Sequence, residues 1–381
     1  MKSNYKIQNI FKGDISVWVI YFLLTVVSLI AVYSSIGLYA IADYKSTPLM
    51  LFIKHAAFVV CSYIAIVMIT HLKIETLFRF SVVTFAISLM LVVAALVKGT
   101  RWISLLGVPF QPSEVVKLGL TMFLAWLMQK NRENLDSPKF FGTLIVIIGI
   151  VSLMIFPENF STAALIFLAS MFTIFFCGIN KSMWLRAMSV VMVLGIIMLT
   201  VFYLWGDKMD FFRTSTWGSR IDAWLHPNTE LSQENMAKMA IASGGFSGHG
   251  VGGTVHARLM TQAHNDFIFA IIIEEGGVLF GSFIFMLYTI FFRRCIKIVR
   301  KCRDLFSATL VASIATIIYF QALVNMSVAV GLLPVTGQTL PFVSFGGTAY
   351  IILSCGIGII QCVAFNIKKQ ERKDEAAKHT A

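Results

Sequence analysis

Side chains that could transfer a proton or hold a phosphate gather at three places in an otherwise apolar chain. One is Ala263-His264-Asn265-Asp266, directly before a long apolar run. The second combines Arg101 with Glu114 and Lys117, and the third is Arg220. A carboxylate can act as a general base, and a cation can offset the charge of an anionic leaving group. These residue types therefore suit group transfer from a phosphate-bearing donor.

Each of these residues also has a structural explanation. Asp266 could be the N-cap of the helix that follows it. Glu114 and Lys117 are three residues apart, so they could form an ion pair on one helix face. Arg220 could lie among lipid head groups, and Asn325, within a later apolar run, could face a cavity lined by the segment 331–347 that follows it. The residue types alone leave both explanations open.

The composition predicts that lipid is the solvent of these segments. Hydrophobic residues make up 57% of the 381 residues, charged residues 13%, and the mean hydropathy is +0.80. About 20 apolar residues cross a bilayer as a helix. Ten runs are predicted to span, and the run at 143–156 is so short that nine spans stay an alternative. The predicted spans are 15–35, 51–70, 80–97, 115–129, 143–156, 162–180, 185–205, 266–291, 307–330 and 343–366.

The basic residues predict the orientation. The N-terminus, alternate loops and the tail hold about two thirds of the 31 Lys and Arg residues. Cytoplasmic loops retain positive charge, so both termini are expected in the cytoplasm and an even number of spans is favoured. The net charge of +12 is then explained by topology and by attraction to anionic lipid head groups. No basic soluble face suggests nucleic-acid binding.

Two outer loops stand out. The segment 206–265 is long, and a short amphipathic helix is expected near 233–242 before its glycine-rich stretch 244–253. No P-loop ending follows those glycines, which disfavours ATP chemistry. The segment 331–347 carries Pro and Gly without charge and is expected to be a rigid re-entrant loop. Glu274 and Glu275 are expected inside the eighth span, paired with Lys54, His55 or backbone amides.

These segments together resemble the FtsW/RodA/SpoVE family of peptidoglycan polymerases, also called SEDS proteins, over most of residues 15–366. The strings that carry the resemblance are Arg101-Trp102-Ile103, Gln111-Pro112-Ser113-Glu114-Val115-Val116-Lys117, Ala263-His264-Asn265-Asp266-Phe267, Gly331-Leu332-Leu333-Pro334 and Leu340-Pro341-Phe342-Val343-Ser344. Their order and spacing agree with the family pattern.

The resemblance implies an all-α integral membrane protein with ten transmembrane helices and a large extracytoplasmic loop between helices 7 and 8. The expected segments are a cytoplasmic N-terminus at 1–14, a transmembrane domain at 15–366 that includes the outer loop 206–265, and a basic cytoplasmic tail at 367–381. The expected location is the bacterial inner membrane.

The resemblance also implies an inverting glycosyltransferase that polymerises lipid II into β-1,4 glycan strands. Asp266 matches the essential aspartate of the family and is expected to be the catalytic base. The substrate-binding residues are then expected to be Arg101, Lys117, Arg220, His264, Glu114 and Asn325. Ala263 favours the division branch over the elongation branch, and the expected partners are a class B penicillin-binding protein, other divisome proteins and membrane lipid.

This chain departs from the family pattern where relatives offer carboxylates, at Asn159 and Gln262. No metal-binding motif is visible, so no cofactor is certain, and the use of a divalent cation, Mg²⁺ or Mn²⁺, is left open. Two rival functions are a flippase for lipid-linked precursors, suggested by Lys54, Lys117, Glu274 and Glu275, and a structural scaffold.

Overall fold

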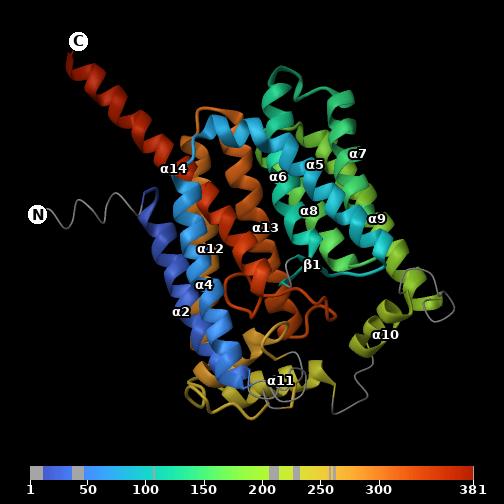
Figure 1. Cartoon of the computed structure of the whole chain (residues 1–381). Helices are drawn as coiled ribbons and strands as arrows, with labels where there is room; N and C mark the ends of the chain where they lie inside the picture. Colours follow the sequence, from blue (N-terminus) through green and yellow to red (C-terminus); the bar gives the residue numbers. More distant parts are fainter. Residues whose placement is uncertain are drawn as a thin grey trace, which may run out of the picture.

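The computed structural model describes residues 12–36, 47–105, 108–205, 214–225, 232–256, 259–260 and 263–380. Within these residues, a helix lies at each of the ten predicted positions (Figure 1). The long helices are α2 (Ile15–Ser35), α4 (Pro48–Thr70), α5 (Ile74–Lys98), α6 (Pro112–Lys130), α7 (Pro138–Ile155), α8 (Phe160–Phe176), α9 (Lys181–Trp205), α12 (Ile268–Lys301), α13 (Leu305–Ala329) and α14 (Gly347–Thr380).

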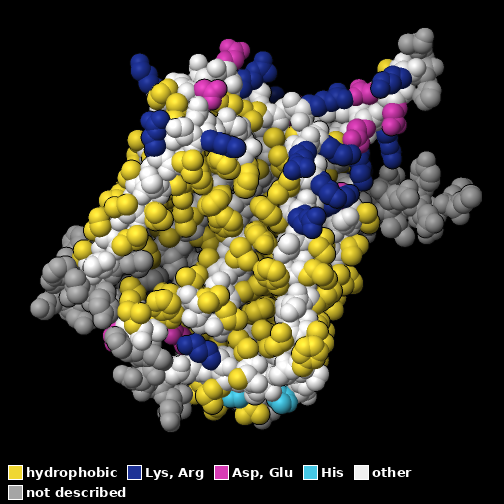
Figure 2. Space-filling model, turned by 180° about the vertical axis from the view of Figure 1, so that it is seen from behind, with side chains coloured by type: hydrophobic (Ala, Val, Ile, Leu, Met, Phe, Trp, Pro, Cys, Tyr) yellow, Lys and Arg dark blue, Asp and Glu magenta, His cyan; other side chains and the backbone are white. Residues whose placement is uncertain are grey.

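The chain is a nearly all-helical, multi-pass membrane protein. Among the described residues, eight helices are long and apolar enough to cross a bilayer. The other two are α8, which has only 17 residues, and α6, which carries Glu114 and Lys117. Length and composition therefore confirm the fold class, whereas the number of ten spans stays a prediction. Figure 2 shows hydrophobic side chains over the middle of one face, with Lys and Arg gathered near the projecting C-terminal helix.

The remaining elements lie near the opposite end of the bundle from that helix (Figure 1). They are a two-stranded antiparallel hairpin of β1 (Ile103–Leu105) and β2 (Val108–Phe110), and the helices α10 (Thr214–Leu225) and α11 (Gln233–Gly244). A short 3-10 turn, η1 (Arg132–Asn134), follows α6. The predicted short helix near 233–242 is confirmed as α11, with Ser232 as its N-cap.

Hydrogen bonds among Asp14, Arg294 and Gln361 join α2, α12 and α14 where α2 begins. Asp14 caps α2 and accepts two hydrogen bonds through Oδ2 from Arg294 of α12, at 2.7 and 2.9 Å. Gln361 of α14 accepts from the amide of Asp14 at 2.6 Å and donates to its carbonyl at 3.0 Å. The charge of Arg294 helps to hold the pKa of Asp14 below its usual value despite burial, which raises it. The start of α2 is thus fixed to the last third of α12 and to the middle of α14.

Helix α12 differs from the predicted span 266–291. It begins at Ile268, ends at Lys301 and is broken at Gly277, where φ is 73° and ψ is 176°. A Cβ atom at Gly277 would lie 2.2 Å from the carbonyl oxygen of Phe246. The glycine-rich outer loop therefore packs against the backbone of α12 at this break, because glycine leaves room and adopts positive φ without strain.

The break changes the expected surroundings of the two glutamates. The carbonyl oxygens of Glu274 and Glu275 accept hydrogen bonds from the amides of His249 and Gly250, at 3.0 and 2.8 Å. Both residues therefore lie against the large loop between α9 and α12, next to the break at Gly277.

Their side chains bind the same loop. The carboxylate of Glu274 is 0% exposed and accepts from the Val255 amide at 2.9 Å and the Thr254 hydroxyl at 2.5 Å. Glu275 accepts from the Gly252 amide at 3.0 Å and from the Ser34 hydroxyl of α2. The predicted pairing with backbone amides is confirmed. Pairing with Lys54 or His55 is wrong, because the break carries both glutamates to the loop.

Helix α14 continues past residue 366, where the basic tail was expected to begin, to Thr380. Its extension is tied to the end of α12 by an ion pair from Lys301 to Glu371, at 3.0 Å, and to the turn after α12 by one from Arg303 to Asp374. The tail is thus a helical continuation of the last span over its described residues.

Gly277→Ala should destabilise the protein by roughly 1–3 kcal/mol or more, because alanine is strained at positive φ and would also clash with the Phe246 carbonyl. Gly149→Ala is the matched control, since a Cβ atom at Gly149, within α7, would meet nothing within 4 Å. Thermal unfolding of the purified protein in detergent measures both variants. Equal melting temperatures would contradict the close packing of the outer loop on α12.

Candidate functional site

Asp266 lies in the turn directly before α12, but it does not cap the helix. The N-cap position belongs to Phe267, and no side chain makes a capping hydrogen bond there. The backbone carbonyl of Asp266 instead accepts a hydrogen bond of 2.9 Å from Nδ2 of Asn325 on α13. The capping explanation of this aspartate is therefore wrong, and its partly exposed side chain is available for chemistry.

The loop 337–346 returns into the helix bundle beside this turn, as the predicted re-entrant loop would. Its carbonyl oxygens are satisfied by side chains from the surrounding helices. Asn325 donates to Gln338 at 2.7 Å, and Gln321 donates to Thr339 at 3.0 Å. Two further bonds run from Tyr288 of α12 to Pro341 and, at 2.8 Å, from Ser28 of α2 to Val343.

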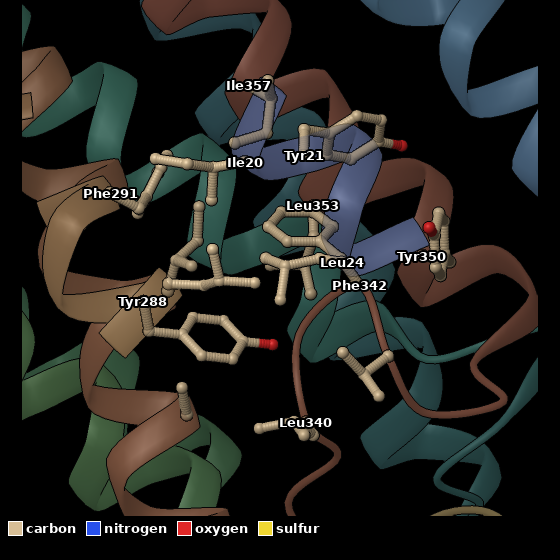
Figure 3. Close-up of a cluster of buried hydrophobic side chains, with 14 of the residues drawn as sticks. Ile20, Tyr21, Leu24, Tyr288, Phe291, Leu340, Phe342, Tyr350, Leu353 and Ile357 are labelled. Atoms are coloured by element: carbon tan, nitrogen blue, oxygen red, sulfur yellow. The ribbon is translucent and has the colours of Figure 1, made fainter. Parts of the chain in front are cut away.

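Apolar side chains anchor the same loop. Figure 3 shows Leu340 and Phe342 beside Tyr288 and Leu24 within the buried cluster. Phe342 has φ of 61°, which a non-glycine residue adopts only where its surroundings hold it. The edge of the Tyr21 ring meets the Phe342 ring at a centroid distance of 5.2 Å. Packing therefore fixes a loop conformation that no regular hydrogen-bond ladder supports.

The loop and the Asp266 turn are also bonded directly. The amide of Phe345 donates to the carbonyl of His264 at 3.0 Å, and the hydroxyl of Ser344 donates to the carbonyl of Asn265 at 2.7 Å. His264 is 1% exposed, so its ring lies beneath the surface against Phe345. A Cβ atom at Gly337 would lie 3.8 Å from Oδ2 of Asp266. These two segments thus form one unit.

The predicted pair of Glu114 and Lys117 is confirmed. Pro112 begins α6, and Lys117 Nζ lies 2.7 Å from Oε2 of Glu114. Lys117 is 2% exposed and donates a second bond, of 2.9 Å, to Oε1 of Gln321. Since Gln321 also holds the carbonyl of Thr339, this buried pair is linked to the re-entrant loop.

Arg220 comes from α10 in the large outer loop and donates to the carbonyl of Val335 at 3.1 Å. Trp224, one turn later, donates to the carbonyl of Gly331 at 3.0 Å. Burial raises the pKa of Asp266 to about 6, and the positive charge of Arg220 acts in the opposite direction. The large loop therefore brings a cation within electrostatic reach of Asp266.

Arg101 interacts with a different acid. Burial raises the pKa of Glu158, in the turn between α7 and α8, and the charge of Arg101 partly offsets this. The next residue, Asn159, caps α8 through the amide of Thr162 at 3.2 Å. The hydroxyl of Thr162 accepts from Gln338 at 2.8 Å, so this end of α8 joins the re-entrant loop. Gln262, the other departure from the family pattern, lies outside the described residues.

Buried polar atoms gather on the segments that surround Asp266. Among the described residues, buried side-chain oxygens without a hydrogen-bond partner in the protein include those of Ser113, Glu158, Ser161, Asn265, Asn325 and Thr336, and others lie on Ser152, Ser307 and Ser313. Buried polar groups are normally paired, so the unpaired ones at the starts of α6 and α8 and near the end of α13 indicate a site for a polar ligand. Sequence reasoning missed Ser113 as a separate candidate and did not consider Ser161 or Thr336.

The described residues do not form a metal site by themselves. No group of three His, Cys, Asp or Glu side chains that could hold a metal ion is found among them. Asp266 offers one carboxylate, and a divalent cation normally takes several oxygen ligands. We therefore derive no step through a metal ion, and a role for Mg²⁺ or Mn²⁺ stays a prediction.

The family model described as "Cell cycle protein", FtsW/RodA/SpoVE, matches residues 14–369. A protein of Geobacter sp. (strain M18) named "Probable peptidoglycan glycosyltransferase FtsW" is 31% identical over 71% of this chain and 72% of its own length. A Bacillus subtilis (strain 168) protein of the same name is 30% identical over 71% of this chain and 68% of its own length.

Solved structures share the fold. A chain from work described as "Structural coordination of polymerization and crosslinking by a peptidoglycan synthase complex" has a TM-score of 0.73 and 20% identity, covering 92% of this chain and 97% of that chain. The Rod shape determining protein RodA of Thermus thermophilus has a TM-score of 0.63 and 20% identity, covering 92% and 96%.

Lys117→Met should lower the free energy of unfolding by roughly 3–5 kcal/mol, because it leaves Glu114 buried without its cation. The double variant Glu114→Gln, Lys117→Met should recover most of that loss. Lys139→Met, at an exposed lysine at the start of α7, is the control. Unfolding of the purified protein in detergent measures all three, and a double variant as unstable as the single one would contradict a buried ion pair.

Proposed function

We infer, because the chain belongs to the FtsW/RodA/SpoVE family, that it is a peptidoglycan glycosyltransferase that polymerises lipid II into β-1,4 glycan strands. The observation that carries this inference is Asp266, a carboxylate held through its backbone among unpaired buried polar atoms. The curated relatives bear the name of this activity.

Asp266 is proposed to be the general base of a single displacement. Its carboxylate accepts the proton of the acceptor's GlcNAc 4-hydroxyl while that oxygen attacks the anomeric carbon of the donor. The bond from the anomeric carbon to the lipid pyrophosphate breaks on the opposite side, so the α-linked donor gives a β-linked product. A pKa of about 6 keeps the carboxylate ionised at neutral pH and makes it a stronger base than an ordinary aspartate.

Arg220, Arg101 and Lys117 are proposed to have different roles in the site. Arg220 is best placed to offset charge on the departing pyrophosphate, because its field reaches Asp266. Arg101 is proposed to act at the edge of the site beside Glu158. Lys117 already binds Glu114 and Gln321, so its contribution is proposed to include holding the re-entrant loop.

Three of the other candidate residues are proposed to support the site from beneath. His264 is buried against Phe345, and Asn325 uses its amide group on two backbone carbonyls. The bond between Asn325 and Asp266 holds the carboxylate-bearing turn in place, and such positioning contributes to rate by keeping the reacting groups aligned. Glu114 supplies the buried counter-charge of Lys117.

The proposed setting is the bacterial inner membrane, with Asp266 on the outer side and both termini in the cytoplasm. The gathering of Lys and Arg beside the C-terminal helix supports that orientation (Figure 2). The names of the curated relatives support a role in cell division rather than elongation. A structural neighbour described as coordinating polymerization and crosslinking supports a class B penicillin-binding protein as partner. Other divisome proteins are proposed on the same ground.

The rival flippase function loses most of its support. Lys54 is exposed on α4, and Glu274 and Glu275 are bound by the outer loop. Lys117, the remaining residue that suggested a flippase, is buried and paired with Glu114.

Asp266→Asn should lower lipid II polymerisation by about 100-fold or more, because the amide cannot accept the hydroxyl proton. The assay uses the purified full-length protein with its partner transpeptidase and lipid II, and it measures glycan strands by gel. Asp136→Asn, at an exposed aspartate before α7, is the matched control and should retain wild-type activity. An active Asp266→Asn variant, or lipid II scrambling that survives this substitution, would overturn the proposed function.

The polymerisation rate should also depend on pH through the same carboxylate. Because the pKa of Asp266 is raised to about 6, the base form is present above that pH and is lost below it, with about a tenfold fall in kcat/KM per pH unit. Arg220→Gln removes the cation that lowers this pKa, so the fall should begin at a higher pH. A rate that is flat between pH 5 and pH 7 would speak against Asp266 as the base.

A further inference from the structure

His55 is a fully buried histidine that makes no direct hydrogen bond to Asp266 among the described contacts. His55 of α4 is 0% exposed, and its Nε2 atom lies 2.8 Å from Oγ of Ser28 on α2. The same Ser28 oxygen lies 2.8 Å from the carbonyl oxygen of Val343. A carbonyl can only accept, and a serine hydroxyl has one proton, which must therefore point to Val343. Ser28 consequently accepts its other bond from an N–H group at Nε2 of His55.

The second ring nitrogen of His55 has a different environment. Nδ1 is buried and has no hydrogen-bond partner among the described residues. The ring packs instead against Phe345 and Tyr350, at centroid distances of 5.5 and 5.7 Å. A buried unpaired nitrogen costs free energy, so an apolar residue of similar shape would serve packing better. What the imidazole adds is a single N–H donor aimed at Ser28.

This donor stands at the beginning of a chain of contacts that ends at the Asp266 turn. Val343, which Ser28 holds, is followed by Ser344 and Phe345, and these two bind the carbonyls of Asn265 and His264 at 2.7 and 3.0 Å. The ring of Phe345 touches both histidine rings, at 5.5 Å from His55 and 5.7 Å from His264.

Short-range bonds also shape the loop at this point, because the amides of Val343 and Ser344 donate to the carbonyl of Leu340 at 3.1 and 3.0 Å. Phe342, the residue before Val343, is in the left-handed region, so no regular ladder continues through it. Among the described residues, the side chain that binds the carbonyl of Val343 is Ser28, and this bond ties the turn to α2.

We propose that His55 is a positioning residue for the glycosyl transfer, acting through Ser28 and the re-entrant loop on the turn that carries Asp266. The inference rests on the proposed function of Asp266. Without the N–H donor, the Ser28 hydroxyl can rotate away, the Val343 carbonyl loses its fixed partner, and the Asp266 turn loses part of its support. The cations assigned to the pyrophosphate lie outside this chain of contacts, so the effect falls on kcat rather than on KM.

Two substitutions separate the donor from the ring. His55→Phe keeps an aromatic ring of similar size without a donor, whereas His55→Gln keeps an N–H donor without the ring. Since small misplacements of reacting groups reduce rates strongly, His55→Phe should lower kcat on the order of tenfold, with KM for lipid II within about twofold of wild type. His55→Gln should restore most of kcat. His71→Phe, at the exposed C-cap of the same helix, should leave kcat and KM unchanged.

A double-mutant cycle tests the route. Ser28→Ala should lower kcat as much as His55→Phe does, and the two together should lower it no further, because both break the same chain of contacts. Fully additive losses would overturn the route through Ser28. Wild-type kcat for His55→Phe, or equally poor kcat for His55→Gln, would overturn the role of the donor.

The melting temperature of every variant is measured beside its rate, in the same detergent. A loss of folded protein that accounts for the whole loss of rate would make His55 merely structural and overturn the inference. The proposed function fails separately, if wild-type protein with its partner makes no glycan from lipid II. An active wild type with unaffected His55 variants would overturn this inference alone.

Discussion

Backbone that is not helical can lie among membrane spans only if protein side chains satisfy its polar groups, and the loop 337–346 is built to meet this requirement. Its carbonyls at Gln338, Thr339, Pro341 and Val343 are bound by side chains from α13, α12 and α2. Phe342 adds apolar support, because its ring lies among buried aromatic side chains, and Gln338 donates to Thr162 of α8. The loop therefore holds its shape because the surrounding helices hold it.

The loop in turn holds the backbone of the turn that carries Asp266. It is joined to the loop through the carbonyls of His264 and Asn265, and Asn325 binds the backbone of Asp266 and of Gln338 with one amide group. The carboxylate itself makes no capping bond, so the fold restrains the backbone and leaves the acid for chemistry. Its burial beside Arg220 gives a pKa of about 6, which suits a base working near neutral pH.

The large outer loop completes the arrangement from the other side. Its helix α10 supplies Arg220, and its glycine-rich end grips α12 at Gly277 through Glu274 and Glu275. These contacts lie next to the break of α12 at Gly277, eleven residues after Asp266. Buried polar side-chain atoms of Ser113, Ser161 and Thr336 still lack partners in the protein. Together with Asp266 and the nearby charge of Arg220, they are the structural basis of the proposed function.

Much of the fold could be predicted from local patterns. Apolar runs long enough to cross a bilayer became helices, and the spacing of Glu114 and Lys117 placed them together, because both features depend only on neighbours within one or two turns. The glycines at 244–253 and at Gly276 and Gly277 were visible, yet nothing local indicated that these two segments meet. The expected pairing of Glu274 and Glu275 with Lys54 or His55 was wrong for this reason.

Residue types and spacing alone indicate that the chain is a helical membrane protein, which end of it is basic, and that Asp266 stands between a long loop and a span. The packing of the helices was needed to show that Asp266 does not cap its helix, that Asn325 binds its backbone, and that His55 contacts Val343 through Ser28. These contacts join residues far apart in the chain. Periodicity and spacing report on neighbours along one helix, whereas such contacts arise only when the spans pack against one another.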